Sequence, residues 1–324
     1  MIKLRYALAL ASLCGVLAPF FLMTGCNREK KRVIGVVPQG RAHLFWQSVN
    51  AGAVAAARET GVEVIWNGPT AETDIPGQIK IVESMINRRV DAIAVAPIDR
   101  KALVSVVERA GREKIPVIIF DSGIATEEFV SQVATDNYLA GEIAAERIGK
   151  ILGGKGVIAM VQNQPGVAST MAREQGFQDR IQKDFPGIRI VDQRYGMADF
   201  AKSLAISENM LTAHPNLDAM FSSNESSTVG AAQALKARQS KVRLVGFDWS
   251  PTLLDDLRAG VMDSLVVQHP FKMGYESVMA AVKTLDGASV EKINNLAPLL
   301  VTIENLDLPE VQAQLNPDLK KYLD

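Results

Sequence analysis

The stretch VRLVGFDWSP (242–251) passes from an apolar run directly into Asp248 and Trp249. A short apolar run of this kind is typical of a strand that is buried on both faces of a sheet. Ser250 and Pro251 follow, and this pair is a signal for the start of a helix. Asp248 therefore stands between a strand and a helix, where it could cap the helix, act as a catalytic base or hold a ligand.

The same succession of a short apolar run and a longer amphipathic segment recurs from residue 33 onward. The predicted strands are 33–37, 62–66, 91–96, 116–120, 157–161, 217–221, 242–247 and 264–268. Between them, apolar residues three and four apart indicate helices in segments such as 78–87, 137–152, 203–211 and 228–237. This repeated alternation predicts an α/β fold of doubly wound parallel sheets with helices on both faces.

Length and composition limit the classes of protein to which the chain can belong. With 324 residues, of which 48% are hydrophobic, the chain is long enough for two globular domains. Its formal net charge is −1, so no basic excess points to nucleic acid as a partner.

The N-terminus resembles a bacterial lipoprotein signal. Lys3 and Arg5 precede an uncharged apolar run over 6–23, and the small-residue motif MTGC follows at 23–26. The alternative is a retained transmembrane anchor, because the run approaches the roughly 20 residues that a spanning helix needs.

We expect cleavage of a signal peptide over 1–25, lipid attachment at Cys26 and a tether over 26–32. The chain has two cysteines, and Cys14 lies within the predicted signal, so the mature chain would have no disulfide. The protein would then lie on the periplasmic or extracellular side of the cell envelope, held to a membrane by its acyl chains.

Polar residues follow several of the predicted strands. Asp121 follows 116–120, Asn224 and Glu225 come shortly after 217–221, and Asp248 follows 242–247. In open parallel sheets, ligands bind outside the carboxyl ends of the strands, so these side chains are expected to converge. Each alone is also a good helix N-cap, although Ser250 is the better candidate beside Asp248.

Several longer motifs keep their order over residues 33–305. They are FWQSVNAG (45–52), DAIAVAPID (91–99), IPVIIFDS (115–122), ATDNYLAGE (134–142), AREQGF (172–177), LTAHPNLDAMFSSNE (211–225), LVGFDWSP (244–251) and VVQHPFKMG (266–274). This set resembles the ribose-binding protein family, the periplasmic sugar-binding components of ABC transporters.

The resemblance implies the type I periplasmic binding protein fold, in which two doubly wound parallel-sheet lobes are joined by three hinge crossings. The N-terminal lobe would comprise 33–135 and 269–298, and the C-terminal lobe 136–268 and 299–324. Such a protein is a monomer without a cofactor. It encloses a sugar or related polyol between its lobes, and an ABC permease with its ATPase recognises the closed form.

Carried over to this chain, the family pattern places five residues on the sugar hydroxyls: Asp121, Arg173, Asn224, Asp248 and Gln268. A buried carboxylate accepts hydroxyl protons, an Arg donates from a fixed plane, and Asn and Gln amides do both.

Further ligand contacts are expected from the residues around these polar groups. Phe45 and Trp46 are suited to cover an apolar sugar face, although both also suit the core, and Trp249 is another candidate for the lining. His43 stands where the family often has Asn, so it is either a contact or a solvated loop residue. Ser122 stands where the ribose binders carry Arg, which points to a sugar other than ribose.

The same residues bear on three other functions: a glycoside hydrolase, a transcriptional effector domain and a sugar sensor. Asp121 and Asp248 could form the acid pair of a glycoside hydrolase, but a hydroxyl clamp explains the pair equally well. No G-x-S-x-G, H-E-x-x-H or P-loop motif occurs, and the histidines lack metal-ligand spacing, so we expect neither an enzyme nor a metal site. A transcriptional effector domain would need a DNA-binding segment before residue 33. A sensor that presents a sugar to a membrane receptor or kinase stays an alternative.

Overall fold

A computed structural model describes residues 31–323 of the chain. The predicted signal peptide over 1–25, the lipidation site Cys26 and most of the tether lie outside the described residues. Within 31–323, no helix combines the length and the apolar character that crossing a membrane requires.

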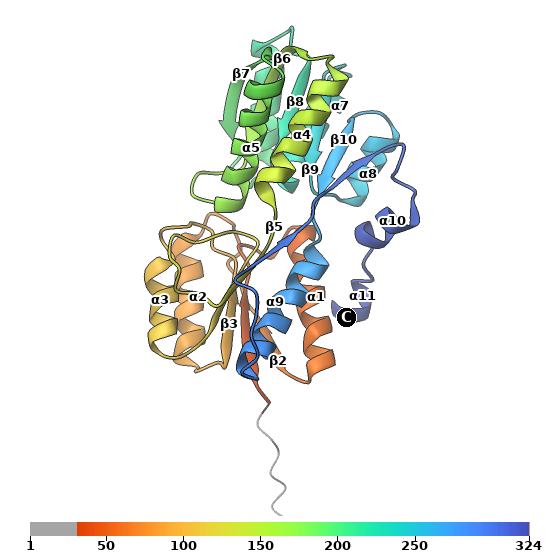
Figure 1. The fold of residues 1–324 in the computed structure, drawn as a ribbon. Coiled ribbons are helices and arrows are strands. Elements are labelled where there is room, and N and C mark those ends of the chain that lie inside the picture. Colours follow the sequence, from red (N-terminus) through yellow and green to blue (C-terminus); the bar gives the residue numbers. More distant parts are fainter. Residues whose placement is uncertain (1–30, 324) are drawn as a thin grey trace, which may run out of the picture. The chain divides into compact units, whose positions relative to one another are not determined.

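Two six-stranded sheets form the framework (Figure 1). The first has the order β11-β5-β4-β3-β1-β2 and consists of β1 (Val33–Val37), β2 (Glu63–Trp66), β3 (Ala92–Val95), β4 (Val117–Phe120), β5 (Ser131–Thr135) and β11 (Ile293–Leu296). The second has the order β12-β10-β9-β8-β6-β7 and consists of β6 (Lys155–Gln162), β7 (Gly187–Tyr195), β8 (Ala219–Ser222), β9 (Arg243–Phe247), β10 (Ser264–Val267) and β12 (Leu299–Thr302). All strand pairs are parallel except β10 with β12.

Helices cover both faces of each sheet, and we call each sheet with its helices a lobe. The N-terminal lobe contains α1 (Leu44–Thr60), α2 (Ile75–Asn87), α3 (Val104–Arg112) and α9 (Pro270–Leu285). The C-terminal lobe contains α4 (Asn137–Ile151), α5 (Ala168–Asp184), α6 (Phe200–Ala213), α7 (Glu225–Ala237) and α8 (Pro251–Arg258). The chain passes between the lobes after β5, after β10 and between β11 and β12 (Figure 1), so the predicted fold with three crossings is confirmed.

Strand residues alternate between the hydrophobic clusters on the two faces of their sheet. In β9, Leu244 packs with residues of α7 and α8, whereas Val245 and Phe247 pack with residues of α4 and α5. Strand β9, which the sequence 242–247 predicted, is thus buried on both faces, as are most of the strands predicted from similar apolar runs. This arrangement holds their carboxyl ends, and the polar residues that follow them, in fixed positions.

Helices α4 and α5 lie in backbone contact, and this contact determines where Arg173 of α5 lies relative to α4. A Cβ atom on Gly141 of α4 would lie 1.9 Å from the carbonyl oxygen of Arg173, and one on Gly176 of α5 would lie 2.2 Å from that of Tyr138. Only glycine allows two backbones to approach so closely. The position of Arg173 in the C-terminal lobe is therefore fixed by the packing of its own helix.

The C-terminal tail forms two short helices, α10 (Pro309–Leu315) and α11 (Lys320–Leu323). Val311 and Leu315 of α10 are buried in the core of the C-terminal lobe. The predicted C-terminal lobe included 299–324, whereas α11 packs against α1 of the N-terminal lobe, where Arg58 donates to the carbonyls of Lys321 at 2.5 Å and Tyr322 at 3.3 Å. The tail therefore contacts both lobes.

Candidate functional site

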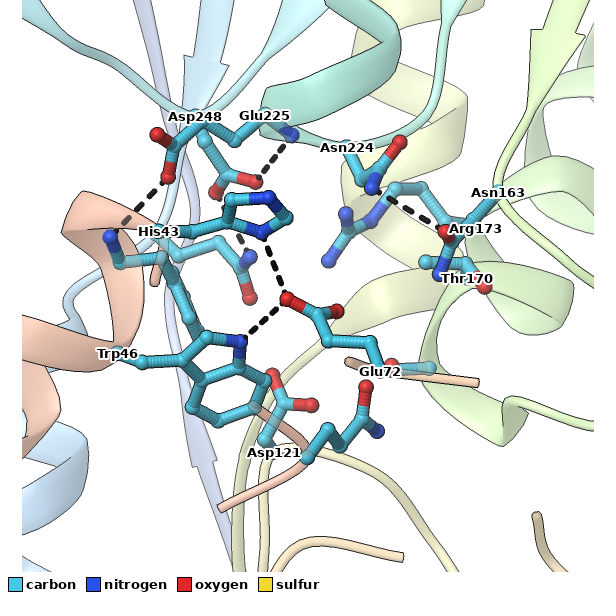
Figure 2. A pocket seen from close by; sticks show the side chains of 14 residues that line it. His43, Trp46, Glu72, Asp121, Asn163, Thr170, Arg173, Asn224, Glu225 and Asp248 are labelled. Atoms are coloured by element: carbon cyan, nitrogen blue, oxygen red, sulfur yellow. Dashed lines mark hydrogen bonds and ion pairs between the residues drawn. The ribbon is translucent and has the colours of Figure 1, made fainter. Parts of the chain in front are cut away.

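A pocket lies where the carboxyl ends of the strands of both lobes meet (Figure 2). It is lined by Gln39, His43, Phe45, Trp46, Glu72, Asp121, Asn163, Ser169, Thr170, Arg173, Asn224, Glu225, Asp248 and Gln268. Most of the residues predicted as ligand contacts are thus brought together, and their role in binding stays a prediction. Among residues 31–323, no three His, Cys, Asp or Glu side chains are grouped so as to hold a metal ion.

Asp121 and Asp248 occupy equivalent positions in the two lobes. Asp121 follows β4 and Asp248 follows β9, and both have left-handed backbones with φ of 59° and 63°. The N–H of each donates to the neighbouring strand at 3.0 Å, Asp121 to Val133 and Asp248 to Val266. A left-handed backbone at a residue other than glycine is strained, and such strain is concentrated at functional sites. The same strained turn therefore presents one carboxylate from each lobe.

The two carboxylates differ in their hydrogen bonds. Asp248 accepts from Gln268 Nε2 at 2.8 Å and from the N–H of Glu225 at 3.1 Å. The Asp121 carboxylate accepts no side-chain or backbone hydrogen bond within the described part of the chain, although Asp121 is only 5% exposed. Burial raises the pKa of Asp121 to about 7, against the opposing charge of Arg173. Asp121 is thus an acceptor that faces the pocket without a protein donor.

Arg173 supplies the buried cation of the pocket. Its guanidinium donates to the carbonyl of Ser223 at 2.5 Å and to Asn137 Oδ1 at 2.7 Å, and it lies 4.0 Å over the ring of Phe247. Both acceptors are neutral, so no carboxylate forms a direct ion pair with this cation among the described residues. Its positive charge remains available to stabilise Asp121 and Asp248, and it lowers the pKa values of both against the effect of burial.

The N-terminal lobe contributes an aromatic wall to the pocket. Phe45 and Trp46 lie edge to face, with ring centroids 4.8 Å apart, and Trp46 also meets Phe120 of β4. Both residues belong to the hydrophobic core and also line the pocket, so a core position and a position beside the ligand do not exclude each other. His43 precedes α1, and Figure 2 shows its ring above Trp46 in the pocket.

Hydrogen bonds join the two lobes around the pocket. Glu225 accepts from the N–H groups of Leu44 at 3.4 Å and Phe45 at 3.1 Å. Gln164 donates to the carbonyl of Glu72 at 2.7 Å. These contacts cross from the C-terminal to the N-terminal lobe, so the structure is that of a closed form.

Comparison with known proteins agrees with this architecture. The family model of the periplasmic binding protein domain matches residues 34–289. The chain belongs to this family. The resemblance to the ribose-binding proteins is thereby confirmed, and two curated relatives show it at the level of sequence. The present chain is 30% identical over 288 residues to the D-ribose/D-allose-binding protein of Pseudomonas aeruginosa, and the alignment covers 86% of this chain and 89% of that one. It is 28% identical over 285 residues to the ribose import binding protein of Bacillus subtilis, covering 84% and 92%.

Solved structures of sugar complexes share the fold of this periplasmic binding protein. A carbohydrate transporter solute binding protein from Agrobacterium radiobacter in complex with D-arabinose has a TM-score of 0.86 at 32% identity, over 89% of this chain and all (100%) of that one. An ABC transporter solute binding protein from Agrobacterium vitis with bound D-fucose has a TM-score of 0.85 at 33% identity, over 88% and 100%.

Two residues predicted as ligand contacts lie outside the pocket of this periplasmic binding protein. Ser122 is fully buried, and its Oγ accepts the N–H of Ser169 at 3.2 Å, so it joins the lobes and does not line the pocket. Trp249 packs in the core with Leu253 and Leu257, because the turn at Asp248 directs the next side chain inward. Ser250, as expected, caps α8 by accepting from the N–H of Leu253.

The pocket also contains residues that the sequence did not mark as ligand contacts: Gln39, Glu72, Asn163, Ser169, Thr170 and Glu225, of which Glu225 was expected only to lie near the other strand-end residues. Asn163 directly follows β6, so the strand-end rule that identified Asp121 and Asp248 would have found it. Glu225 adjoins Asn224 at another strand end. Glu72 lies on the loop between β2 and α2, where no pattern in the sequence marks it.

Proposed function

We propose that the protein captures a monosaccharide or related polyol outside the cytoplasm and delivers it, unchanged, to an ABC permease with its ATPase. The observation that carries this proposal is the pair of carboxylates, Asp121 and Asp248, presented from equivalent turns of the two lobes into one pocket. A ligand whose hydroxyl groups reach both aspartates contacts both lobes and therefore favours the closed form. The sugars named for the related proteins belong to this class of ligand.

The chemistry of the lining suits a neutral ligand with many hydroxyl groups. Asp121 accepts hydroxyl protons, Arg173 and Asn224 donate to hydroxyl oxygens, and Trp46 covers the apolar C–H face of a sugar ring. Hydrogen bonds to charged groups contribute about 1.5–3 kcal/mol each, so a few matched hydroxyls suffice for tight binding. An analogue that lacks one of them leaves a buried charge unpaired, which provides specificity.

We further propose that the mature protein is a monomer that lipid at Cys26 anchors to a membrane of the cell envelope. The support is the order of basic, apolar and small residues before Cys26 in the sequence. Mass spectrometry of the N-terminal peptide tests this proposal. An acylated peptide that begins at Cys26 is expected, with loss of membrane retention in Cys26→Ser. An unmodified peptide that begins at Met1 would contradict it.

A thermal-shift screen against monosaccharides, sugar alcohols and nucleosides tests the function, with titration calorimetry on each hit. A ligand at 1,000 times its Kd stabilises the folded protein by about 4 kcal/mol, which is a readily measured shift in Tm. We expect a shift with at least one sugar and none with the same sugar in Asp121→Asn. Chromatography of the ligand after release should return it intact. Hydrolysis products, or no hit among the sugars and polyols, would contradict the proposal.

A further inference from the structure

Glu72 is one of the pocket residues to which the family pattern gives no role. It comes from the loop between β2 and α2, its side chain is 9% exposed, and it lines the pocket. We infer that Glu72 determines specificity: one carboxylate oxygen fixes the wall formed by Trp46 and His43, and the other accepts a hydroxyl group of the ligand. This inference rests on the proposed function.

A single oxygen of Glu72 binds both neighbouring rings. Oε1 accepts from Trp46 Nε1 at 2.7 Å and lies 2.6 Å from His43 Nδ1 (Figure 2). Trp46 is only 3% exposed, and a buried indole N–H needs an acceptor. Because the indole and the imidazole share one acceptor atom, their positions depend on each other, and Glu72 fixes the shape of this side of the pocket.

The second oxygen, Oε2, is free to bind a ligand. It forms no hydrogen bond with any residue in the described part of the chain. Figure 2 shows the carboxylate of Glu72 pointing into the pocket, toward the side from which Arg173 extends. An ionised carboxylate only accepts hydrogen bonds, so Oε2 favours a ligand with a donor at this place and disfavours the corresponding deoxy compound.

The loop that carries Glu72 is held from two sides. Its carbonyl oxygen accepts from Gln164 Nε2 of the C-terminal lobe at 2.7 Å. On the other side, a Cβ atom on Gly40 would lie 2.7 Å from Glu72 Cγ, so the side chain packs closely on the backbone of the loop before α1. The contacts with Gly40 and Trp46 lie within the N-terminal lobe and hold the carboxylate before the lobes close, which lowers the entropy lost on binding. The bond from Gln164 is added on closure.

The charge of His43 indicates which kind of ligand group donates the hydrogen bond to Glu72 Oε2. Burial lowers the pKa of His43, but its hydrogen bond to Glu72 and the charges of Glu72, Glu225 and Asp248 outweigh burial and raise the pKa to about 9. The imidazolium therefore already balances the charge of Glu72 near neutral pH. A neutral hydroxyl group suffices as the ligand donor, and a protonated amine is not needed.

The test compares wild type with Glu72→Gln, which keeps the size of the side chain and turns one acceptor into a donor. Against a sugar hit and its monodeoxy analogues, one analogue should bind wild type about tenfold or more weakly than the parent sugar. That difference should vanish in the variant. Glu63→Gln, a change at an exposed residue of β2 in the same lobe, serves as the control and should match wild type. Equal discrimination in wild type and Glu72→Gln would overturn the inference.

A second measurement needs no ligand and tests the positioning role directly. The pKa of His43, followed by NMR in the ligand-free protein, should fall by about one unit or more in Glu72→Gln and stay unchanged in Glu63→Gln. An unchanged His43 pKa in Glu72→Gln would overturn the assignment of Glu72 as the partner of His43. If no sugar binds wild type, the proposed function fails, whereas this titration still decides whether Glu72 fixes the wall.

Discussion

Glu225 of the C-terminal lobe caps a helix of the N-terminal lobe: its Oε2 accepts the N–H of Phe45 at 3.1 Å, and its Oε1 that of Leu44 at 3.4 Å. These are the first N–H groups of α1, and His43, the residue at the N-cap position, provides no side-chain acceptor for them. A helix N-terminus favours negative charge, so the Glu225 carboxylate stabilises it. Closure of the lobes thus completes α1, whose first turn carries the aromatic wall of the pocket.

Glu225→Ala should shift the ligand-free protein toward an open form, because α1 then loses its cap only in the closed state. Loss of an N-cap costs about 1 kcal/mol, which is roughly a fivefold change in the ratio of closed to open molecules. We expect a larger radius of gyration in solution scattering and a weaker apparent affinity for any ligand. Glu225→Gln, which keeps an acceptor oxygen, should fall between Glu225→Ala and wild type. Identical scattering of all three proteins would show that this contact does not stabilise closure.

Asp121→Asn should abolish ligand binding and yet stabilise the ligand-free protein at pH 8. At that pH the Asp121 carboxylate is mostly ionised, and it is buried without a hydrogen-bond donor. Removal of an unpaired buried charge should raise the free energy of unfolding by about 1–3 kcal/mol. Asparagine also tolerates the left-handed backbone at this position, where φ is 59°. Denaturant unfolding and calorimetry measure the two effects.

Asp121→Ala serves as the comparison for the backbone. It removes the same charge but places alanine in the left-handed region, so it should be less stable than Asp121→Asn by about 1 kcal/mol. If the two variants were equally stable, backbone strain at Asp121 would not contribute to the free energy of unfolding. The equivalent turn at Asp248 would then give no reason to expect strain there either.

The two strand-end aspartates could be predicted from the sequence, whereas the details of the pocket could not. Apolar runs followed by Asp121 and Asp248 place both residues at carboxyl ends of parallel strands, and this rule requires only the order of elements. Trp249 was misplaced because the positive φ of Asp248 changes the direction of the chain, and no residue type in VGFDWS signals this change. Ser122 was misplaced because its contact with Ser169 depends on how the two lobes meet.

The strands β5 and β11 and the loop residue Glu72 could not be predicted from the sequence for a related reason. β5 (SQVAT) and β11 (INNL) lack an apolar run, and they are paired with each other at the edge of the first sheet. Their strand conformation depends on partners distant in the sequence, which local periodicity does not reveal. Glu72 likewise acquires its place from Trp46, His43 and Gln164, which come from three other segments.

Ligand affinity should rise as the pH rises from about 5 to 8. In the ligand-free protein, burial raises the pKa values of Asp121 and Glu225 to about 7. Ligand hydroxyls donate to the ionised form of Asp121, so binding near pH 6 should release protons. Calorimetry in two buffers with different heats of ionisation measures this release. Proton release of the same size in Asp121→Glu and wild type is compatible with the mechanism, whereas binding without proton release in wild type would contradict it.

The raised pKa values of Asp121 and Glu225 also determine whether the free energy of unfolding rises or falls with pH. Asp121 and Glu225 hold their protons to higher pH in the folded protein than in the unfolded chain, where their ordinary pKa values are 3.8 and 4.5. Their contribution to the free energy of unfolding is fully present below these ordinary values, and it is lost as the pH rises through about 7. The stability difference between Asp121→Asn and wild type should therefore grow from pH 4 to pH 8.

Tyr322→Ala should speed ligand release without much effect on unfolding. The tail is anchored in the C-terminal lobe by α10, and α11 reaches the N-terminal lobe, where the ring of Tyr322 lies 5.5 Å from that of Phe271 and beneath the guanidinium of Arg58. No residue of α11 is buried, so the variant removes little hydrophobic stabilisation from either lobe. It does remove a contact that an opening motion must break. We expect the dissociation rate of a bound sugar, measured by stopped-flow fluorescence, to rise about threefold to tenfold, as for loss of about 1 kcal/mol.

Lys320→Ala provides the matched control for the tail, because Lys320 belongs to the same helix and its side chain is exposed. This variant should release the ligand at the wild-type rate. Arg58→Ala removes the guanidinium from the ring of Tyr322 and also the hydrogen bonds to the carbonyls of Lys321 and Tyr322, so it should likewise speed release. The double variant should exceed either single variant but fall short of the sum of the two effects, because both changes break the contact between ring and guanidinium. Fully additive effects of the two substitutions would mean that Arg58 and Tyr322 act separately, and that α11 does not tie the lobes through this pair.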